Sequence, residues 1–131
     1  MIGIVFVSHS ARLAEGVKEL AEQMTQGAVK MAAVGGLPDG GLGTDAERIG
    51  AAIREVRGDR GVLVLMDLGS AVMSAQVAVE TLGEDAGRVL LSNAPMVEGG
   101  VVAAVEASIG KSLDEAEASA VQACTMRKVE G

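Results

Sequence analysis

The feature that most constrains the fold is an unbroken apolar run at residues 2–7, IGIVFV, which ends abruptly at the polar triplet Ser8-His9-Ser10. A short apolar run without polar alternation is typical of a β-strand covered on both faces, as in a parallel sheet flanked by helices. In open α/β sheets, ligands bind at the carboxyl edge of the strands. His9, the only histidine of the sequence, therefore follows a strand at the place where such a fold carries its chemistry.

Three more short strands, rich in apolar residues, are expected at residues 29–34, 62–66 and 88–91, and segments with helical periodicity separate them. Strands that alternate with helices indicate a parallel sheet with right-handed crossover connections. We therefore predict an α/β fold in the order βαβαβαβαα, with helices on both faces of the sheet. The sequence contains no long linker or internal repeat, so residues 1–131 are expected to form a single domain.

Apolar residues at helical spacing mark the expected helices. The first helix should end near Gly27 and the second near Gly58, and the third, at residues 71–82, is apolar on much of its surface and should be well buried. The apolar stripes of the other helices are Leu13, Val17, Leu20 and Met24; Ile49, Ile53 and Val56; Val97, Val101, Val105 and Ile109; and Leu113, Ala116, Ala120 and Cys124.

Caps and methionines give two further expectations. Thr44 with Glu47, and Ser112 with Glu115, have the spacing of capping boxes, in which two side chains satisfy the first amides of a helix. With one Phe and no Trp or Tyr, the core must be aliphatic, and the methionines are expected to fill gaps in it. These methionines are Met24, Met31, Met66, Met73 and Met96.

Polar groups follow the first, third and fourth expected strands, and the carboxyl ends of parallel strands share one edge of a sheet. An Asp67 carboxylate that accepts a hydrogen bond from one ring nitrogen of His9 would orient the ring and leave the other nitrogen free as a base or nucleophile. The first N–H groups of the next helix, at Gly69 and Ser70, together with the Ser70 hydroxyl, would form an anion cradle. Together these groups suit a phosphoryl group carried on His9. The polar segments are Ser8-His9-Ser10, Asp67-Leu68-Gly69-Ser70 and Ser92-Asn93.

Each of these features also has a simpler alternative. His9 is alternatively a hydrogen-bonded turn residue, and Asp67 a helix N-cap. The glycine loop, residues 35–43, has neither the position nor the spacing of a dinucleotide fingerprint, which leaves a lid, a partner-contact loop or a plain connection. Cys124 is expected to be a small buried hydrophobe. One histidine and no clustered ligands argue against a metal site.

The net charge of −7, from 18 acidic and 11 basic side chains, argues against a nucleic acid or an anionic membrane as partner, since both favour a basic surface. The near absence of aromatic residues also removes any platform for base stacking. A single cysteine excludes an internal disulfide framework. The N-terminus lacks the basic region of a signal peptide, and its apolar run is too short to span a bilayer. We therefore expect a soluble cytoplasmic protein.

Three sequence blocks, in this order, resemble the EIIA domain of the DhaM family, the phosphotransferase subunits of dihydroxyacetone kinase. They are residues 4–10 with 13–17 (IVFVSHS and LAEGV), residues 64–71 (VLMDLGSA) and residues 91–99 (LSNAPMVEG). The resemblance covers nearly the whole chain. Because this family has the mannose-type EIIA fold, the resemblance implies a four-stranded sheet in the order 2-1-3-4 and a homodimer.

The resemblance also implies a role for each matching residue. His9 matches the phosphorylated histidine and Asp67 its hydrogen-bond partner, while Gly69, Ser70 and Ala71 match the turn beside the phosphate. In this family the phosphocarrier HPr supplies the phosphoryl group, which passes to ADP on the DhaL subunit and then to dihydroxyacetone on DhaK. Neither a metal nor another resident cofactor is implied. Some members continue into HPr-like and enzyme-I-like domains, which these residues do not include, so we expect the phosphoryl group to come from separate proteins.

Both partners must reach His9, which should therefore be exposed on a shallow surface. The expected partner contacts are Ser10, Arg12, Leu68 and Met73; an exposed helix charge is the alternative interpretation of Arg12.

The chain departs from the family pattern after the glycine loop, where Gly43-Thr44-Asp45 replaces Gly-Thr-Ser. Other functions stay open: a mannose- or sorbose-type EIIA domain that feeds a sugar permease, and a metabolite-binding regulatory domain without chemistry. A receiver domain phosphorylated on an aspartate needs an acidic cluster after the first strand, where this chain has Ser-His-Ser.

Overall fold

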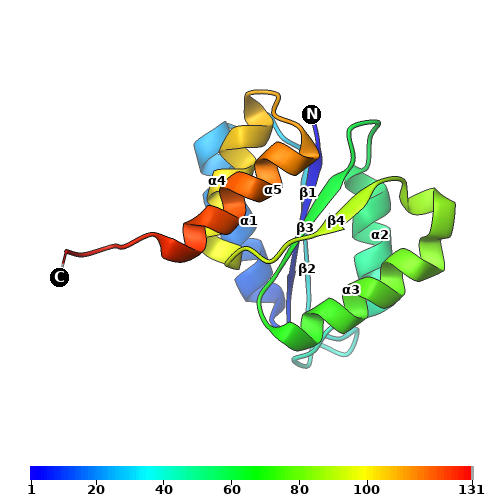
Figure 1. Cartoon of the computed structure of the whole chain (residues 1–131). Helices are drawn as coiled ribbons and strands as arrows, with labels where there is room; N and C mark the ends of the chain where they lie inside the picture. Colours follow the sequence, from blue (N-terminus) through cyan, green and yellow to red (C-terminus); the bar gives the residue numbers. More distant parts are fainter. Residues whose placement is uncertain (131) are drawn as a thin grey trace.

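The structure, a computed structural model, describes residues 1–130 and contains one open parallel sheet between two layers of helices (Figure 1). The strands are β1 (Gly3–Ser8), β2 (Met31–Gly35), β3 (Val62–Met66) and β4 (Val89–Leu91). Their order, β2-β1-β3-β4, confirms the α/β fold and the strand order implied by the resemblance. β1 lies between β2 and β3, and this explains why every one of its residues is buried.

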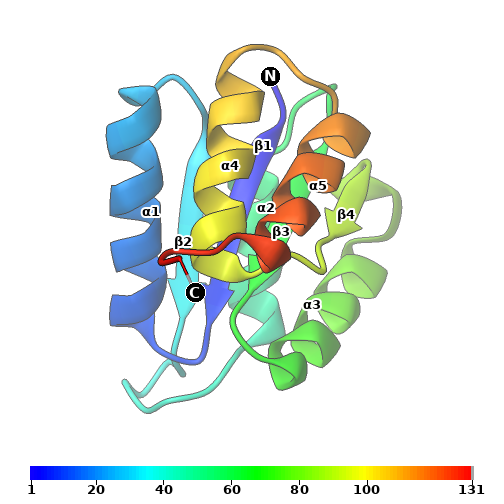
Figure 2. The ribbon, with the colours of Figure 1, turned by 60° about the vertical axis from the view of Figure 1, so that its left-hand side comes forward.

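The helices divide between the two faces of the sheet (Figure 2). One face is covered by α1 (Ala11–Thr25), α4 (Met96–Ser108) and α5 (Leu113–Gln122), and the other by α2 (Ala46–Val56) and α3 (Gly69–Leu82). Short 3₁₀ turns, η1 (Gly83–Ala86) and η2 (Ala123–Thr125), follow α3 and α5. The predicted element order is therefore confirmed, although the second strand begins two residues later than expected and the third helix begins at Gly69.

Successive side chains of β1 enter different cores because neighbouring residues of a strand point to opposite faces. Ile4 and Phe6 join the core beneath α1, α4 and α5, whereas Val5 and Val7 join the core beneath α2 and α3. The strand is thus apolar on both sides, as its sequence predicted.

Helix α4 turns its smallest residues toward the sheet. Gly100 comes so close that a Cβ on it would lie 2.6 Å from Cε1 of the fully buried Phe6. On α1, likewise, Ala14 and Ala21 are fully buried. Side chains of this size let a helix approach the sheet closely, and larger apolar residues on the same helix then point outward.

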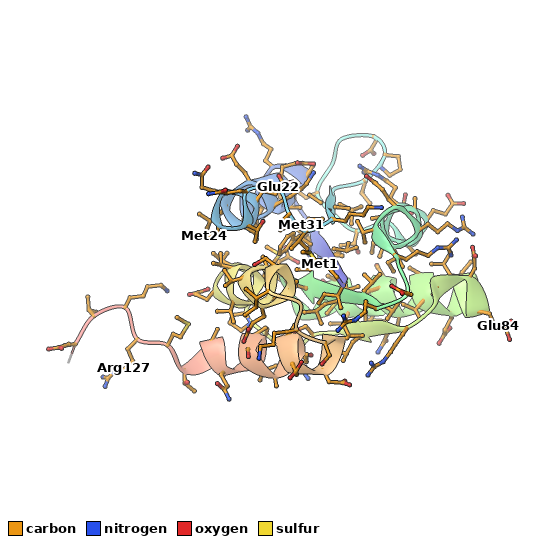
Figure 3. The ribbon with its side chains drawn as sticks, turned by 90° about the horizontal axis from the view of Figure 1, so that it is seen from above. Met1, Glu22, Met24, Met31, Glu84 and Arg127 are labelled. Carbon is orange, nitrogen blue, oxygen red and sulfur yellow. The ribbon has the colours of Figure 1, made fainter. Side chains whose placement is uncertain are left out.

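Of the predicted apolar stripe of α1 only Val17 is buried, and no residue of the predicted stripe of α4 is fully buried, so most of both stripes was wrong as a buried face. Exposed fractions on α1 are 45% for Leu13, 42% for Leu20 and 57% for Met24. On α4 they are 39% for Val97 and 41% for Val105, and Ile109, the C-cap of this helix, is 67% exposed. Seen from above, Met24 lies on the outer side of α1, whereas Met31 lies between α1 and the sheet (Figure 3).

Helix α3 is less buried than predicted, because it packs on the sheet through Ala71, Ala75 and Ala78 while Met73 and Val77 remain exposed. The expectation of core methionines is confirmed for Met31, Met66 and Met96 and wrong for Met24 and Met73. Cys124 was also predicted to be buried, but it is exposed, because the chain leaves the helical stripe of α5 at η2.

One of the two predicted capping boxes is present. Ser112 and Glu115 bond reciprocally at the start of α5. At α2, Asp45 is the cap instead of Thr44, and its Oδ1 accepts a hydrogen bond from the Glu47 amide at 3.2 Å. Thr44 instead lies with its hydroxyl 2.6 Å from that of Ser74 on α3. Within residues 1–130, no helix combines the length and the hydropathy that a membrane span requires.

Two glycine-to-alanine substitutions should change the stability in opposite directions. Gly100→Ala should lower the free energy of unfolding by roughly 1–3 kcal/mol, because the new methyl group overlaps the Phe6 ring. Gly16→Ala, on the exposed side of α1 where a Cβ meets nothing within 4 Å, should raise it by about 0.5–1 kcal/mol through helix propensity. Urea unfolding measures both effects, and a stabilising Gly100→Ala would contradict the close approach of α4.

Candidate active site

The carboxyl ends of β1 and β3 bring His9 and Asp67 side by side. The two strands pair in parallel, and the amide of Asp67 continues the pairing by donating to the Val7 carbonyl at 3.1 Å. The start of α3 and the glycine loop lie at this same edge of the sheet (Figure 1). The predicted gathering of the polar segments at 8–10 and 67–70 is therefore present, and Ser92 and Asn93 of the last segment line one cavity together with Asp67.

The carboxylate of Asp67 accepts four hydrogen bonds. Its Oδ1 accepts from Nδ1 of His9 at 3.0 Å and from the Leu68 amide at 2.7 Å. Its Oδ2 accepts from the Ser8 hydroxyl at 2.9 Å and from the His9 amide at 3.0 Å. An ionised carboxylate has about four acceptor positions, so all of them are in use. Asp67 therefore holds the His9 ring and does not serve as the N-cap of α3, a position that Leu68 occupies.

These hydrogen bonds decide the protonation state of the pair. Burial opposes ionisation of Asp67, but the bonds from His9, Ser8 and Leu68 outweigh it and hold the pKa of the carboxyl below its usual value. Because the charged carboxylate only accepts, Nδ1 of His9 must carry the proton. The electron pair of the neutral ring is then on Nε2, the nitrogen that faces away from Asp67.

Ser70 meets that second nitrogen. Its Oγ lies 2.6 Å from Nε2, so the hydroxyl donates to the ring. Ser70 stands in the first turn of α3, where no side chain caps the helix, and the N–H groups of Gly69 and Ser70 have no intrahelical acceptor. The Ala71 amide, in contrast, donates to the Leu68 carbonyl at 3.0 Å. The side chain of His9 is 26% exposed, so a partner can reach Nε2.

The two serines that flank His9 in the sequence, Ser8 and Ser10, form hydrogen bonds that fix the backbone around it. The hydroxyl of Ser8, which is fully buried, donates to Asp67 and accepts from the Ser10 amide at 3.0 Å. Ser10 itself is the N-cap of α1, where its hydroxyl accepts from the Leu13 amide. Ser8 belongs to the polar triplet, but its role was not predicted from the sequence; the available signal was a serine that closes an otherwise apolar strand.

Both ends of the glycine loop contact the backbone around His9. A Cβ on Gly35 would lie 2.7 Å from the carbonyl oxygens of Ser8 and Ser10, so only glycine allows β2 to end this close to His9. At the other end, the Gly43 amide donates to the His9 carbonyl at 2.8 Å. The neighbouring Thr44 then reaches Ser74, one helical turn beyond Ser70. Sequence reasoning missed this connection, because it depends on tertiary distances alone.

The predicted partner contacts lie around this edge at the surface. Leu68 is 63% exposed and Met73 is 70% exposed, and Leu42, at 78%, adds an apolar residue from the glycine loop. Arg12 is exposed on the first turn of α1. Among residues 1–130, no three His, Cys, Asp or Glu side chains are grouped as a metal ion would need.

Comparison with known families gives a match over residues 3–117 to the EIIA-man family, described as the PTS system fructose IIA component. Among similar proteins, the phosphoryl donor subunit DhaM of the PEP-dependent dihydroxyacetone kinase of Escherichia coli is 42% identical over 98% of this chain, which spans only 28% of that protein's length. The donor subunit DhaM of the PEP-dependent dihydroxyacetone kinase 2 of Listeria innocua is 36% identical, and the match covers 86% of this chain and 90% of that protein.

Solved structures show the same fold. A crystal structure of a protein of unknown function superposes with a TM-score of 0.83 at 34% identity and covers 99% of this chain and 100% of that one. A sigma-54 interaction domain protein from Enterococcus faecalis gives a TM-score of 0.60 at 17% identity, covering 88% of this chain and 84% of that one, and shares the fold.

Asp67→Asn should destabilise the protein at neutral pH and much less in acid. An amide cannot accept four hydrogen bonds, so the free energy of unfolding at pH 7 should fall by about 1–3 kcal/mol. Because the folded pKa of Asp67 is depressed, its charged form stabilises the fold above the unfolded pKa of about 3.9, and this contribution is lost as the pH falls through the folded pKa. The gap between wild type and variant should therefore narrow below about pH 4.

Urea unfolding between neutral and acidic pH measures this gap. The matched control is Asp59→Asn, an exposed aspartate, which should change the free energy of unfolding by less than about 0.5 kcal/mol. A gap that stays constant down to the lowest pH would show that Asp67 is not held in its charged form.

Proposed function

This chain belongs to the EIIA-man family, and from that membership we propose that it carries a phosphoryl group on Nε2 of His9 and donates it within a PEP-dependent dihydroxyacetone kinase. One observation carries the proposal: the His9 ring is held from both sides, by Asp67 at Nδ1 and by Ser70 at Nε2. An imidazole that is oriented in this way and open to solvent is a prepared nucleophile.

The transfer to His9 needs no separate base. Because Asp67 keeps the proton on Nδ1, the electron pair of Nε2 attacks the phosphorus atom of the incoming group. The bond from phosphorus to the donor nitrogen breaks, and that nitrogen keeps the electron pair. The phosphorylated His9 ring retains its Nδ1 proton and is cationic, and the negative charge of Asp67 stabilises it. No proton leaves the ring during transfer in either direction.

The start of α3 then holds the phosphoryl oxygens. The Ser70 hydroxyl turns away from Nε2 during the attack and donates to a phosphoryl oxygen, and the free N–H groups of Gly69 and Ser70 donate to the same group. A contact from the Ala71 amide requires its bond to the Leu68 carbonyl to open.

The donor is HPr, and the acceptor is ADP held on the DhaL subunit. A terminal phosphate oxygen of ADP attacks the phosphorus atom, Nε2 recovers its electron pair and ATP forms; the phosphoryl group then passes to dihydroxyacetone on DhaK. The relatives from Escherichia coli and Listeria innocua support the donor role, since both are named phosphoryl donor subunits of such kinases. The exposure of Leu68 and Met73 at the start of α3 supports an apolar surface on which the two partners dock in turn.

Two alternatives make different use of the same residues. A mannose- or sorbose-type EIIA domain would load His9 in the same way but pass the phosphoryl group to a second sugar-transport domain. The description of the matching family as a PTS system fructose IIA component supports this alternative. A regulatory domain that only binds a metabolite would not be phosphorylated at all.

Incubation with enzyme I, HPr and phosphoenolpyruvate should add one acid-labile phosphoryl group to the protein, measured by intact mass. His9→Gln should abolish the gain. Ser70→Ala should leave the gain possible but slow it by about ten- to a hundredfold, because one donor to the phosphoryl oxygens is lost. Ser108→Ala, a serine on α4 whose hydroxyl bonds within its own helix, is the matched control and should leave the rate unchanged.

The second half of the assay separates the alternatives. Addition of DhaL loaded with ADP, with DhaK and dihydroxyacetone, should discharge the phosphorylated protein. A folded wild type that gains no mass would refute the phosphoryl carrier, and a loaded protein that discharges only to a sugar-transport domain would assign it to the permease branch.

We also propose that the chain forms a homodimer through the outer sides of α1 and α4, where Leu20 and Val105 are exposed on the same face of the sheet. Val105→Glu should raise the dimer dissociation constant at least about tenfold, because the new charge would be buried. Sedimentation velocity measures the change, with Ala118→Glu on the exposed side of α5 as the control. A monomeric wild type would contradict the proposal.

A further inference from the structure

A cavity of about 460 Å³ lies next to the site, between the first turn of α1 and the glycine loop. Its lining includes Ser10 and Arg12 from α1, Gly36 and Leu42 from the loop, and Arg48 from α2. Ser10 directly follows His9, so this arginine cavity borders the residue that we propose to be phosphorylated. Nothing in the mechanism above uses it.

The lining of the arginine cavity is positively charged in a chain that is strongly acidic overall. Two arginines and no aspartate or glutamate line the cavity, whereas the whole sequence has 18 acidic and 11 basic side chains. Asp39, in the same loop, is outside the lining, and its carboxylate accepts from the Gly41 amide at 2.8 Å. Among residues 1–130, Arg12 forms no ion pair with an acidic side chain.

Arg48 is held in place by the backbone at the start of the loop. One of its terminal nitrogens donates to the carbonyl of Gly35 at 3.3 Å and to that of Gly36 at 3.1 Å. A guanidinium group carries five N–H donors, so this anchoring leaves donors for a ligand. Because the side chain is already oriented, little conformational entropy is lost when an anion binds.

The loop wall is also preformed and open to a ligand. The Leu37 amide donates to the Gly41 carbonyl at 2.8 Å, and the Gly40 amide donates to the Leu37 carbonyl at 2.9 Å. The glycines of this wall have no side chains that would fill the cavity. Guanidinium groups that converge on one cavity are a typical environment of a phosphate group.

We propose that the arginine cavity binds the diphosphate group of the acceptor nucleotide during transfer from His9. The inference rests on the proposed function, in which a negatively charged phosphoryl group, the Asp67 carboxylate and a nucleoside diphosphate have to come together. Arg12 and Arg48 offset the repulsion between these groups where the diphosphate approaches His9. They are needed for the transfer to the nucleotide, whereas loading from a phosphohistidine brings no diphosphate to the site.

The first test uses inorganic pyrophosphate and the unphosphorylated ¹⁵N-labelled protein. Saturable shifts of the Gly36, Gly40 and Gly41 amide signals are expected, and Arg12→Gln should weaken the binding by about tenfold. The control is Arg60→Gln, which removes the same charge at the opposite edge of the sheet, where Arg60 donates to the Gly110 carbonyl. Arg60→Gln should bind pyrophosphate as the wild type does.

The second test measures loading by HPr and discharge to the ADP-loaded acceptor separately, in single turnovers. Arg12→Gln should slow the discharge by about tenfold more than it slows the loading, and Arg60→Gln should change neither step. Equal behaviour of Arg12→Gln and Arg60→Gln in both tests would overturn the proposal. Slowed discharge without any pyrophosphate-induced shift would assign the cavity to an acidic segment of the acceptor protein instead. A wild type that cannot be loaded refutes the proposed function, and the pyrophosphate titration then decides on the cavity alone.

Discussion

The fully occupied carboxylate of Asp67 is the interaction on which the rest of the site depends. It joins the ends of β1 and β3, since three of its four donors come from the Ser8-His9 segment and the fourth is the amide of its own neighbour Leu68. With every acceptor position filled, the carboxylate can hold the imidazole in only one tautomer. The identity of the reactive nitrogen is thus set by backbone geometry at a strand end, before any partner binds.

Small residues provide the second constraint. Alanine and glycine on the inner sides of α1, α3 and α4 let three helices lie close to the sheet, and the larger apolar residues of the same helices consequently lie at the surface. A small domain with almost no aromatic residues can in this way be stable inside and still present apolar contact surfaces outside. The cores and the candidate docking surfaces therefore come from one packing arrangement.

Much of this could be predicted from the sequence. Four apolar runs separated by helical segments specify a parallel sheet, and such a sheet places His9 beside Asp67 with Ser70 close by. What sequence reasoning missed depends on distances between elements: the need for glycine at position 35, the Thr44–Ser74 contact and the role of buried Ser8. The larger apolar residues of α1 and α4 were wrongly predicted to face the sheet. Apolar periodicity does not show whether a helix packs on a sheet through its larger aliphatic residues or through its alanines and glycines.

The pairing of β1 with β3 also affects the order of events during synthesis. His9 leaves the ribosome before its partner Asp67, which lies 58 residues later in the chain, and before Ser70, which lies 61 residues later. A nascent chain therefore has a histidine without orientation until the third strand has emerged and found its place beside the first. Such non-local pairing is among the slower steps of folding. Reactivity at His9 should thus appear only once the central sheet is complete, and a truncated or misfolded chain would not compete for phosphoryl groups.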